Sequence, residues 1–312
     1  MRILILGAGG TGGYFGGRLA QAGIDVTFLV RTARAEQLAA AGLVIRSPLG
    51  DATLPVSHVT APRLPALVAT RPFDLVLLSC KAYDLDNSIQ AIAPAMGAST
   101  TLLPILNGLR HYRELDDRFG AAQVLGGLCF ISAVKAGNGD ILHLGKAASI
   151  TFGERTGDPQ SPRCRALADL FARAGVEHVL ADRIQQEQWT KFAFLATLAA
   201  GTCLMRASVG VIVATEGGRD FMEQLYGECL AVAGAECWPV PEAAQTRALD
   251  MLTRPGSPLT ASMLRDLEAG QRTEAAHVVG DMLTRARQHG VPAPLLGAAW
   301  IHLQAYEARR SA

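Results

Sequence analysis

Cysteine is scarce in this chain, and its thiols are scattered. They form no C-x-x-C pair and no cluster with histidine, and the six residues are Cys80, Cys129, Cys164, Cys203, Cys229 and Cys237. Structural zinc sites need clustered thiolates or imidazoles, and disulfide frameworks belong mainly to small secreted chains. We therefore expect no metal site and a reducing compartment.

An excess of charge of either sign is also absent. The 312 residues hold 29 Lys and Arg against 28 Asp and Glu, which gives a net charge of +1. A chain with this balance has no overall field that would gather nucleic acid or an anionic membrane. Apolar residues make up 49% of the sequence, which is typical of a folded protein with a sizeable core.

Long hydrophobic runs are missing as well. The uncharged apolar stretches Ala121–Val134 and Phe192–Met205 have 14 residues each, short of the roughly 20 that a membrane-spanning helix needs. The first strand-like run begins at once after Met1-Arg2, without the basic segment and long apolar stretch of a secretory signal. We expect a soluble cytoplasmic protein that binds no membrane.

Strand and helix patterns alternate in the first part of the chain. The predicted strands are Arg2–Leu6, Asp25–Val30, Leu43–Arg46, Ala52–Val59, Phe73–Ser79, Thr100–Leu106, Val124–Val134, Asp140–Phe152 (a strand or hairpin) and Val176–Leu180. The predicted helices between them are Gly9–Gln21, Thr32–Ala40, Asp84–Ala95, Leu109–Arg118 and Arg163–Ala174. This order predicts an α/β fold with a doubly wound parallel sheet that helices cover on both faces.

The pattern becomes helical after about Ala181. The predicted helices are Gln185–Met205, Gly217–Ala235, Glu242–Leu252, Thr273–Gln288 and Leu295–Arg309. We therefore expect an α/β domain over residues 1–181 and an all-α domain over residues 182–312.

A glycine-rich loop, Gly7-Ala8-Gly9-Gly10-Thr11-Gly12, follows the first predicted strand and opens the first helix. The pattern G-x-G-x-x-G is weak alone in a chain with 32 glycines, and this strand–loop–helix context strengthens it. Its glycines allow a tight turn, a close approach of backbone to pyrophosphate, and tight packing of helix on strand. The loop predicts a bound dinucleotide, and the alternative is a glycine-rich turn without a ligand.

Arginine stands at the end of the second predicted strand, where an NAD-binding protein usually has a carboxylate. Arg31 occupies this position, and Arg34 follows closely. A guanidinium group pairs with a 2′-phosphate that a carboxylate would repel. Arg31 therefore favours NADP(H) over NAD(H), unless it is only an exposed residue at a helix start.

Several short motifs continue in order along the chain: Cys80-Lys81-Ala82, Leu106-Asn107-Gly108, Trp189-Thr190-Lys191, Ser262-Met263-Leu264-Arg265-Asp266 and Arg272-Thr273-Glu274. With the glycine loop and Arg31, this series resembles the ketopantoate reductases (2-dehydropantoate 2-reductases) from end to end. The resemblance implies a Rossmann-type domain followed by a helical domain, with the reacting groups in the cleft between the two domains.

The resemblance implies cofactor-binding roles for three residues of the α/β part. Lys81 and Asn107 each follow a predicted strand at the carboxyl edge, where doubly wound sheets bind ligands. The backbone of Ala133 is implied to meet the cofactor as well. From the residues alone, Lys81 is equally a solvated lysine at a helix entry, and Asn107 is equally a turn former before Gly108.

The resemblance places the chemistry on Lys191 and Glu274. Lys191 is implied to bind the substrate and to protonate its oxygen, Asn107 to lie beside the substrate carbonyl, and Glu274 to hold the cofactor and brace the lysine. Ser262 is implied to bind the substrate carboxylate. From the residues alone, Lys191 at the start of an apolar helix is either a lysine that faces a desolvated cleft or a snorkelling lysine at a helix end. The alternatives for the other two are a first-turn acid after a Thr273 cap for Glu274 and a helix cap for Ser262.

The chain differs from the family at three positions that the resemblance implies should bind the substrate. Leu195, Ala199 and Val209 stand where the family has asparagines that hold the substrate. Arg206 is a candidate replacement anchor for a carboxylate, or an exposed arginine after a buried helix.

The expected function is NADPH-dependent reduction of a 2-oxo acid, with 2-dehydropantoate to pantoate in pantothenate and coenzyme A biosynthesis as the first expectation. One alternative is reduction of a more apolar 2-oxo acid or an imine. Another is a non-catalytic NADP(H)-binding regulator. The sequence does not decide whether the protein forms a homodimer, because the apolar helices of the second half can line a dimer interface or the core of a monomer.

Overall fold

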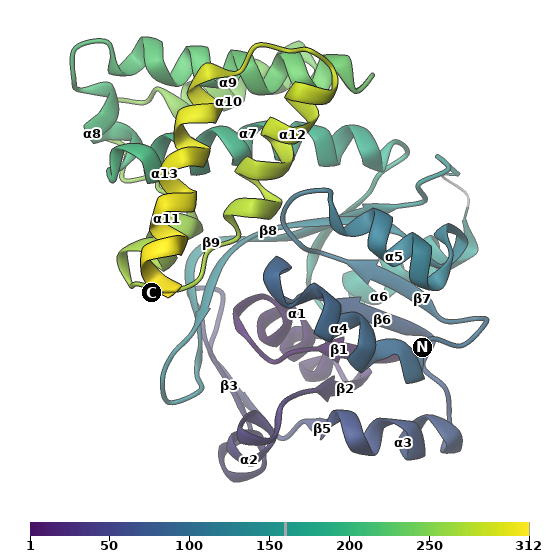
Figure 1. The fold of residues 1–312 in the computed structure, drawn as a ribbon. Helices are drawn as coiled ribbons and strands as arrows, with labels where there is room; N and C mark the ends of the chain where they lie inside the picture. The colour runs from purple at the N-terminus through teal and green to yellow at the C-terminus, as the bar shows by residue number, and fades with distance from the viewer. Residues whose placement is uncertain (159–160, 312) are drawn as a thin grey trace. The chain divides into compact units, whose positions relative to one another are not determined.

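The computed structural model describes residues 1–158 and 161–311, and the chain divides into two compact units (Figure 1). Unit 1 contains Met1–Leu106 and His111–Ile184. Unit 2 contains Asn107–Arg110 and the chain from Gln185 onward. The short segment Asn107–Arg110 therefore belongs to unit 2, although it interrupts the sequence of unit 1.

The first sheet of unit 1 is five-stranded and parallel, with strand order β5-β2-β1-β6-β7. Its strands are β1 (Arg2–Leu6), β2 (Asp25–Leu29), β5 (Ser57–Val59), β6 (Leu75–Leu78) and β7 (Thr101–Pro104). Ile3, Leu4 and Ile5 of β1 are all completely buried. Successive residues of a strand point to opposite faces, so both faces of this sheet are covered.

Helices connect these strands, as the alternating pattern predicts. They are α1 (Gly10–Gln21), α2 (Thr32–Ala41), α3 (Leu64–Thr70), α4 (Leu85–Ile92) and α5 (His111–Phe119), with 3₁₀ turns at Ala61–Arg63, Ala82–Asp84, Ala93–Ala95 and Ala121–Gln123. Helix α3 was not predicted from the sequence.

A second sheet lies in the same unit, and the sequence did not predict it. It has the order β10-β9-β3-β4, and β8 pairs with β9. Its strands are β3 (Leu43–Arg46), β4 (Ala52–Leu54), β8 (Gly126–Lys135), β9 (Ile141–Gly153) and β10 (Glu177–Leu180), and α6 (Pro162–Arg173) precedes β10. The turn at Asn138-Gly139 makes β8 and β9 an antiparallel hairpin, so the strand–helix alternation is interrupted there.

Two corrections concern strand ends. The predicted strand Ala52–Val59 is two strands in different sheets, β4 and β5. Pro55 stands between them, and proline cannot donate a ladder hydrogen bond. The predicted strands Phe73–Ser79 and Thr100–Leu106 are shorter than expected, so Lys81 and Asn107 lie in the loops that follow β6 and β7.

Helix α1 packs against both sheets of unit 1, and its glycines explain how. A Cβ atom at Gly16 would lie 2.7 Å from Phe28 and Ile5 of the first sheet, and one at Gly17 would lie 2.5 Å from Ile45 of the second. Side chains on both faces of α1 would push the sheets apart. The glycines therefore allow one helix to serve both layers, at the cost of their low helix propensity.

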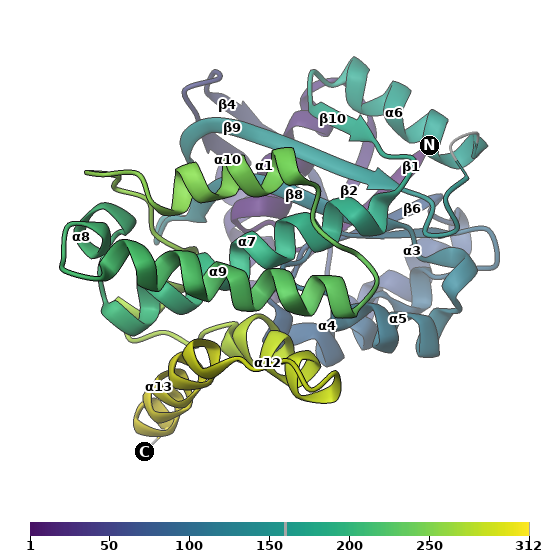
Figure 2. The same cartoon turned by 90° about the horizontal axis from the view of Figure 1, so that it is seen from above.

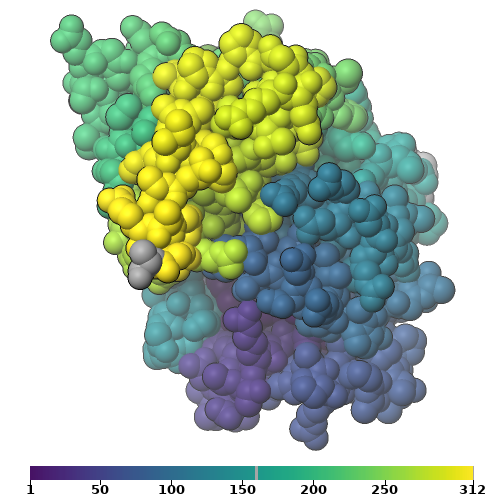
Figure 3. Space-filling view, viewed as in Figure 1, coloured from purple at the N-terminus to yellow at the C-terminus, as the bar shows by residue number. Residues whose placement is uncertain are grey.

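Unit 2 is helical (Figure 2). Its elements are α7 (Ile184–Met205), α8 (Val209–Val213), α9 (Gly218–Ala235), α10 (Glu242–Leu252), α11 (Ser262–Glu268), the 3₁₀ turn Ala275–His277, α12 (Val279–Gln288) and α13 (Pro294–Ser311). The last helices, yellow in Figure 3, form much of the visible surface of this unit. No helix in the described part of the chain is long and apolar enough to cross a membrane.

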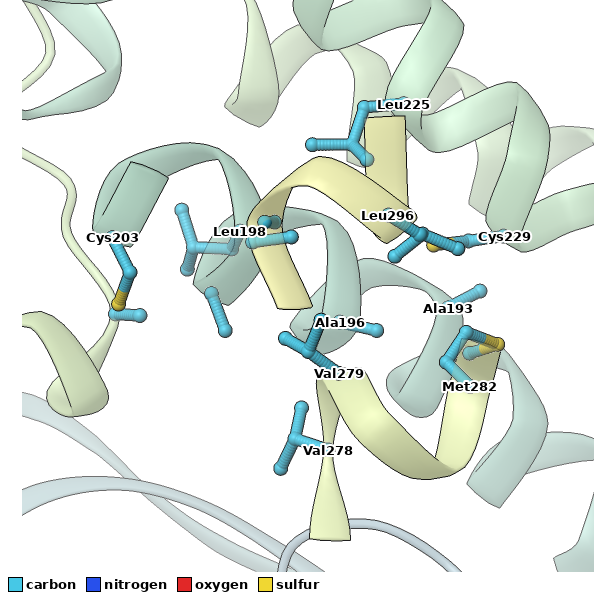
Figure 4. Packing of buried hydrophobic residues seen from close by; sticks show 14 of the residues in the cluster. Ala193, Ala196, Leu198, Cys203, Leu225, Cys229, Val278, Val279, Met282 and Leu296 are labelled. Atoms are coloured by element: carbon cyan, nitrogen blue, oxygen red, sulfur yellow. The ribbon is translucent and has the colours of Figure 1, made fainter. Parts of the chain in front are cut away.

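Helix α7 supplies much of the core of unit 2 (Figure 4). Ala193 and Ala196 are fully buried in a cluster that also contains Leu225 of α9, Met282 of α12 and Leu296 of α13. Small side chains on α7 let neighbouring helices approach closely. A helix with apolar residues on most of its faces is expected at the centre of a domain.

Candidate active site

The glycine loop forms the turn that its motif predicts. Gly7 has a φ of +87° and its N–H donates to the carbonyl of Leu29 at 2.9 Å, which joins the loop to β2. Helix α1 begins at Gly10, and its N-cap residue Gly9 makes no side-chain capping bond. The first amides of a helix lack partners within the helix, so they are suited to bind an anion.

The glycines of this loop fall into two kinds. A Cβ at Gly12 would lie 2.6 Å from the carbonyl oxygen of Gly7, and one at Gly10 would lie 2.3 Å from that of Ala133. A Cβ at Gly9 would meet nothing within 4 Å. Gly10 and Gly12 therefore serve packing within unit 1, whereas the surface over Gly9 is open. This arrangement fits a pyrophosphate that contacts the backbone at Gly9.

The remaining predicted cofactor residues of unit 1 lie around this loop. Ala8 is 3% exposed, and Thr11 is half-buried in the first turn of α1. Ala133 lies in β8 at a register shift against β9. Half-buried Lys81 is the N-cap of the 3₁₀ turn after β6.

Two guanidinium groups lie near the loop, and sequence reasoning had assigned a role to only one. The side chain of Arg31 is 82% exposed, and its Nη2 lies 3.1 Å from Oδ2 of Asp84. Arg34 donates from Nε to the carbonyl of Ala8 at 3.1 Å. Its Nη2 is buried and has no hydrogen-bond partner within the described chain. Burial lowers the pKa of Arg34, against the charge of Asp140.

Asn107, Lys191 and Glu274 come together in unit 2. The ammonium Nζ of Lys191 donates to Oδ1 of Asn107 at 3.3 Å, and Nδ2 of Asn107 donates to Oε2 of Glu274 at 3.5 Å. Lys191 is half-buried, and Glu274 is only 6% exposed. The asparagine amide thus joins a cation to a buried carboxylate through one acceptor and one donor.

Gly108 holds the Asn107 turn in place, and the sequence reasoning gave it no role beyond that turn. It has a φ of +77°, and a Cβ there would lie 2.5 Å from the carbonyl oxygen of His277. The same Cβ would lie 3.8 Å from the ring of Phe192, next to Lys191 in sequence. Gly108 therefore packs where the three segments that carry Asn107, Lys191 and Glu274 meet.

The surroundings of Glu274 correct one expectation. The sequence predicted a helix from Thr273 with Thr273 as its cap, but α12 begins at Val279, after the 3₁₀ turn. The N–H and hydroxyl of Thr273 both donate to Oε1 of Glu307 on α13, each at 2.7 Å. With its hydroxyl engaged there, Thr273 cannot cap a helix, and Glu274 lies in the loop before α12.

Ser262 is the first residue of α11, after the N-cap residue Ala261. The hydrogen bonds that join Asn107, Lys191 and Glu274 do not include Ser262. Its proposed contact with a substrate carboxylate stays a prediction.

The positions of the replaced asparagines differ in burial. Leu195 is half-buried, whereas Ala199 and Val209 are 2% and 0% exposed in the core of unit 2. Arg206 is exposed and follows the end of α7 at Met205. At 1.5 Å per residue, about 21 Å of helix separates Met205 from Lys191. A role for Arg206 as a carboxylate anchor stays a prediction.

The described residues contain no group of three or more His, Cys, Asp or Glu side chains that could hold a metal ion.

Comparisons with known proteins match most of the chain to one family. Residues 3–157 match the family described as ketopantoate reductase PanE/ApbA, and residues 183–307 match its C-terminal part. The chain is 38% identical over 310 residues to the uncharacterized oxidoreductase YkpB of Bacillus subtilis, covering 99% of this chain and 100% of that one. It is 27% identical to a 2-dehydropantoate 2-reductase of a Nostoc species, covering 99% and 96%.

A crystal structure from Geobacter metallireducens shares the fold. It is a 2-dehydropantoate 2-reductase with 29% identity and a TM-score of 0.87, covering 98% of this chain and 99% of that one. The two matched regions together span most of the sequence, and the expected α/β domain followed by a helical domain is confirmed. The chain belongs to the ketopantoate reductase PanE/ApbA family and is an oxidoreductase that acts on a CH–OH group with NAD(P)H as its cofactor.

Proposed function

We propose that this protein reduces a 2-oxo acid to a 2-hydroxy acid with NADPH. The observation that supports it most is the hydrogen-bonded series Lys191–Asn107–Glu274, which places one ammonium group beside a polar amide in unit 2. 2-Dehydropantoate is the first substrate to test, because relatives across nearly the full length are named 2-dehydropantoate 2-reductases.

In this proposal, the glycine loop and Arg31 bind the cofactor, together with Arg34. Backbone amides at Gly9 and Gly10 meet the pyrophosphate, and the exposed Arg31 guanidinium meets the 2′-phosphate. Lys81 and Ala133 are the further cofactor contacts proposed in unit 1. The residues 1–181 form the cofactor domain of this proposal, and the residues 182–312 form the substrate domain.

Reduction of the keto group requires a hydride at the carbonyl carbon and a proton at the carbonyl oxygen. The bound dinucleotide supplies the hydride. Lys191 donates a hydrogen bond to the substrate oxygen and gives it a proton as negative charge develops there. Ser262 is the proposed contact for the substrate carboxylate.

Asn107 and Glu274 keep Lys191 ready for that step. Glu274 accepts from the amide of Asn107, which turns the amide oxygen toward the lysine. An ammonium has three N–H donors, and the hydrogen bond to Asn107 uses one of them.

The proposal is tested by measuring NADPH and NADH oxidation with a panel of 2-oxo acids that includes 2-dehydropantoate. We expect reduction of at least one member, with NADPH preferred. Tight NADPH binding without turnover of any member contradicts the proposal and supports a non-catalytic regulator.

The role of Lys191 has its own test. Lys191→Met keeps the length of the side chain and removes the ammonium. We expect kcat to fall by about 10²–10⁴-fold, while the Kd for NADPH from fluorescence titration stays within about twofold. Lys146→Met, at an exposed position in β9, is the control. Full turnover by Lys191→Met would show that the proton donor is another group.

A further inference from the structure

The accessible side chains of α7 in the turn that follows Lys191 are apolar. Phe194 and Leu195 lie three and four residues after Lys191, so they share its helix face at neighbouring positions. All three side chains are half-buried. The residues on the other faces of this segment, Phe192 and Ala193, are 2% and 0% exposed. A molecule that reaches the lysine ammonium along α7 therefore meets a phenyl ring and an isobutyl group.

The next turns of α7 offer no polar group on this face. Leu198 and Ala199 are 4% and 2% exposed. The hydroxyls of Thr197 and Thr202 donate to the carbonyls four residues before them, at 2.9 and 2.6 Å, and both threonines are fully buried. Their donors are therefore committed to the helix backbone.

We propose that the substrate is a 2-oxo acid whose group next to the keto carbon is a bulky hydrocarbon, and that Phe194 and Leu195 select it. This inference rests on the function proposed above. Positions three and four residues on are the neighbours of Lys191 on the helix surface, so a substrate with its keto oxygen at Lys191 can place its adjoining group against Phe194 and Leu195. An apolar group there is buried favourably, while a hydroxyl loses water and meets no hydrogen-bonding side chain at these two positions.

The test compares two substrates that differ by one hydroxyl group. 3,3-Dimethyl-2-oxobutanoate is 2-dehydropantoate without its hydroxyl, so the acid, the ketone and the branching are the same. We expect kcat/KM with NADPH to favour the compound without the hydroxyl by about 10–100-fold. Equal values, or a preference for 2-dehydropantoate, would overturn the inference and leave the reductase function standing.

A pair of variants locates the preference. Leu195→Asn introduces an amide beside Lys191 and is expected to lower the ratio of the two kcat/KM values by about tenfold. Leu204→Asn is the matched control, because Leu204 is also half-buried on α7, and about 20 Å of helix separates it from Lys191. It should leave the ratio unchanged, and an equal shift in both variants would contradict selection at Leu195.

The wild-type ratio decides the proposal even where a variant fails to fold. If the wild-type protein binds NADPH and reduces neither compound nor any other 2-oxo acid, the proposed function itself fails, and this inference fails with it.

Discussion

Neighbouring glycines of the phosphate loop are needed for different reasons. Gly9 has an extended backbone, with φ −88° and ψ −165°, and open space where a Cβ would lie. Gly10 presses on the Ala133 carbonyl, where a Cβ would come within 2.3 Å. The G-x-G-x-x-G spacing identifies the loop from sequence, but Gly10 is not one of its fixed glycines. Its packing role depends on β8, which lies far away in the sequence.

Alanine substitutions separate these two roles. Gly9→Ala should unfold at the wild-type temperature and bind NADPH about tenfold or more weakly, because the new methyl group lies where the pyrophosphate approaches. Gly10→Ala should lose about 1–3 kcal/mol of stability through its clash with backbone. For each variant, thermal unfolding measures the stability and fluorescence titration measures the Kd for NADPH. Wild-type NADPH affinity in Gly9→Ala would contradict the assignment of the loop.

Elements that are distant in sequence meet at the hydrogen-bonded series of Asn107, Lys191 and Glu274. The loop after β7, helix α7 and the loop before α12 each supply one member of the Asn107, Lys191 and Glu274 series. Sequence patterns locate such loops and helices, and the family resemblance selects these three residues. The patterns do not show that the Gly108 turn packs on the His277 carbonyl. Hydrophobic periodicity predicts helices and strands, but it does not predict contacts between the segments that connect them.

The Gly108 contact predicts a defect in catalysis rather than in folding alone. Gly108→Ala should lower kcat by about tenfold or more, because the Cβ displaces the Asn107 turn from His277. Gly290→Ala is the matched control, with φ +65° and open space around a Cβ. Both variants carry the strain of a left-handed residue, about 1 kcal/mol. Equal losses of kcat would show that strain alone is responsible.

At the scale of the whole molecule, the sequence predicts the order of strands and helices better than their assembly. Fully apolar runs such as Arg2–Leu6 identify buried strands. The second sheet, in which β3 lies between β9 and β4, cannot be predicted from the same runs. The sequence of a short strand does not show which sheet the strand joins. The glycines of α1 are the one local sign that this helix is covered on two sides.

An ion pair between Arg163 of α6 and Glu154, which follows β9, predicts how unit 1 responds to acid. Both Nε and Nη2 of Arg163 lie 2.6 Å from the carboxylate of Glu154. This bonding to Arg163 holds the pKa of Glu154 below its ordinary value of 4.5. The unfolded chain therefore binds this proton at a higher pH than the folded chain. The pair stabilises the fold fully above about pH 4.5 and progressively less as the pH falls below it.

Glu154→Gln should therefore be less stable than the wild type at pH 7, and the difference should shrink below about pH 4.5. Urea unfolding between pH 3 and pH 7 measures it. Glu36→Gln, at an exposed position of α2 beyond its first turn, is the control and should match the wild type throughout. A Glu154→Gln deficit that stays constant with pH would contradict the effect of the ion pair.

The segment Asn107–Arg110 has a consequence for protein engineering. A chimera that joins residues 1–184 of this chain to the helical half of a relative would inherit Asn107 from one parent and Lys191 and Glu274 from the other. If Asn107–Arg110 is exchanged together with the helical half, then Asn107, Lys191 and Glu274 all come from the same parent. We expect active hybrids when this four-residue segment and the helical half share a parent, and weaker activity when they do not.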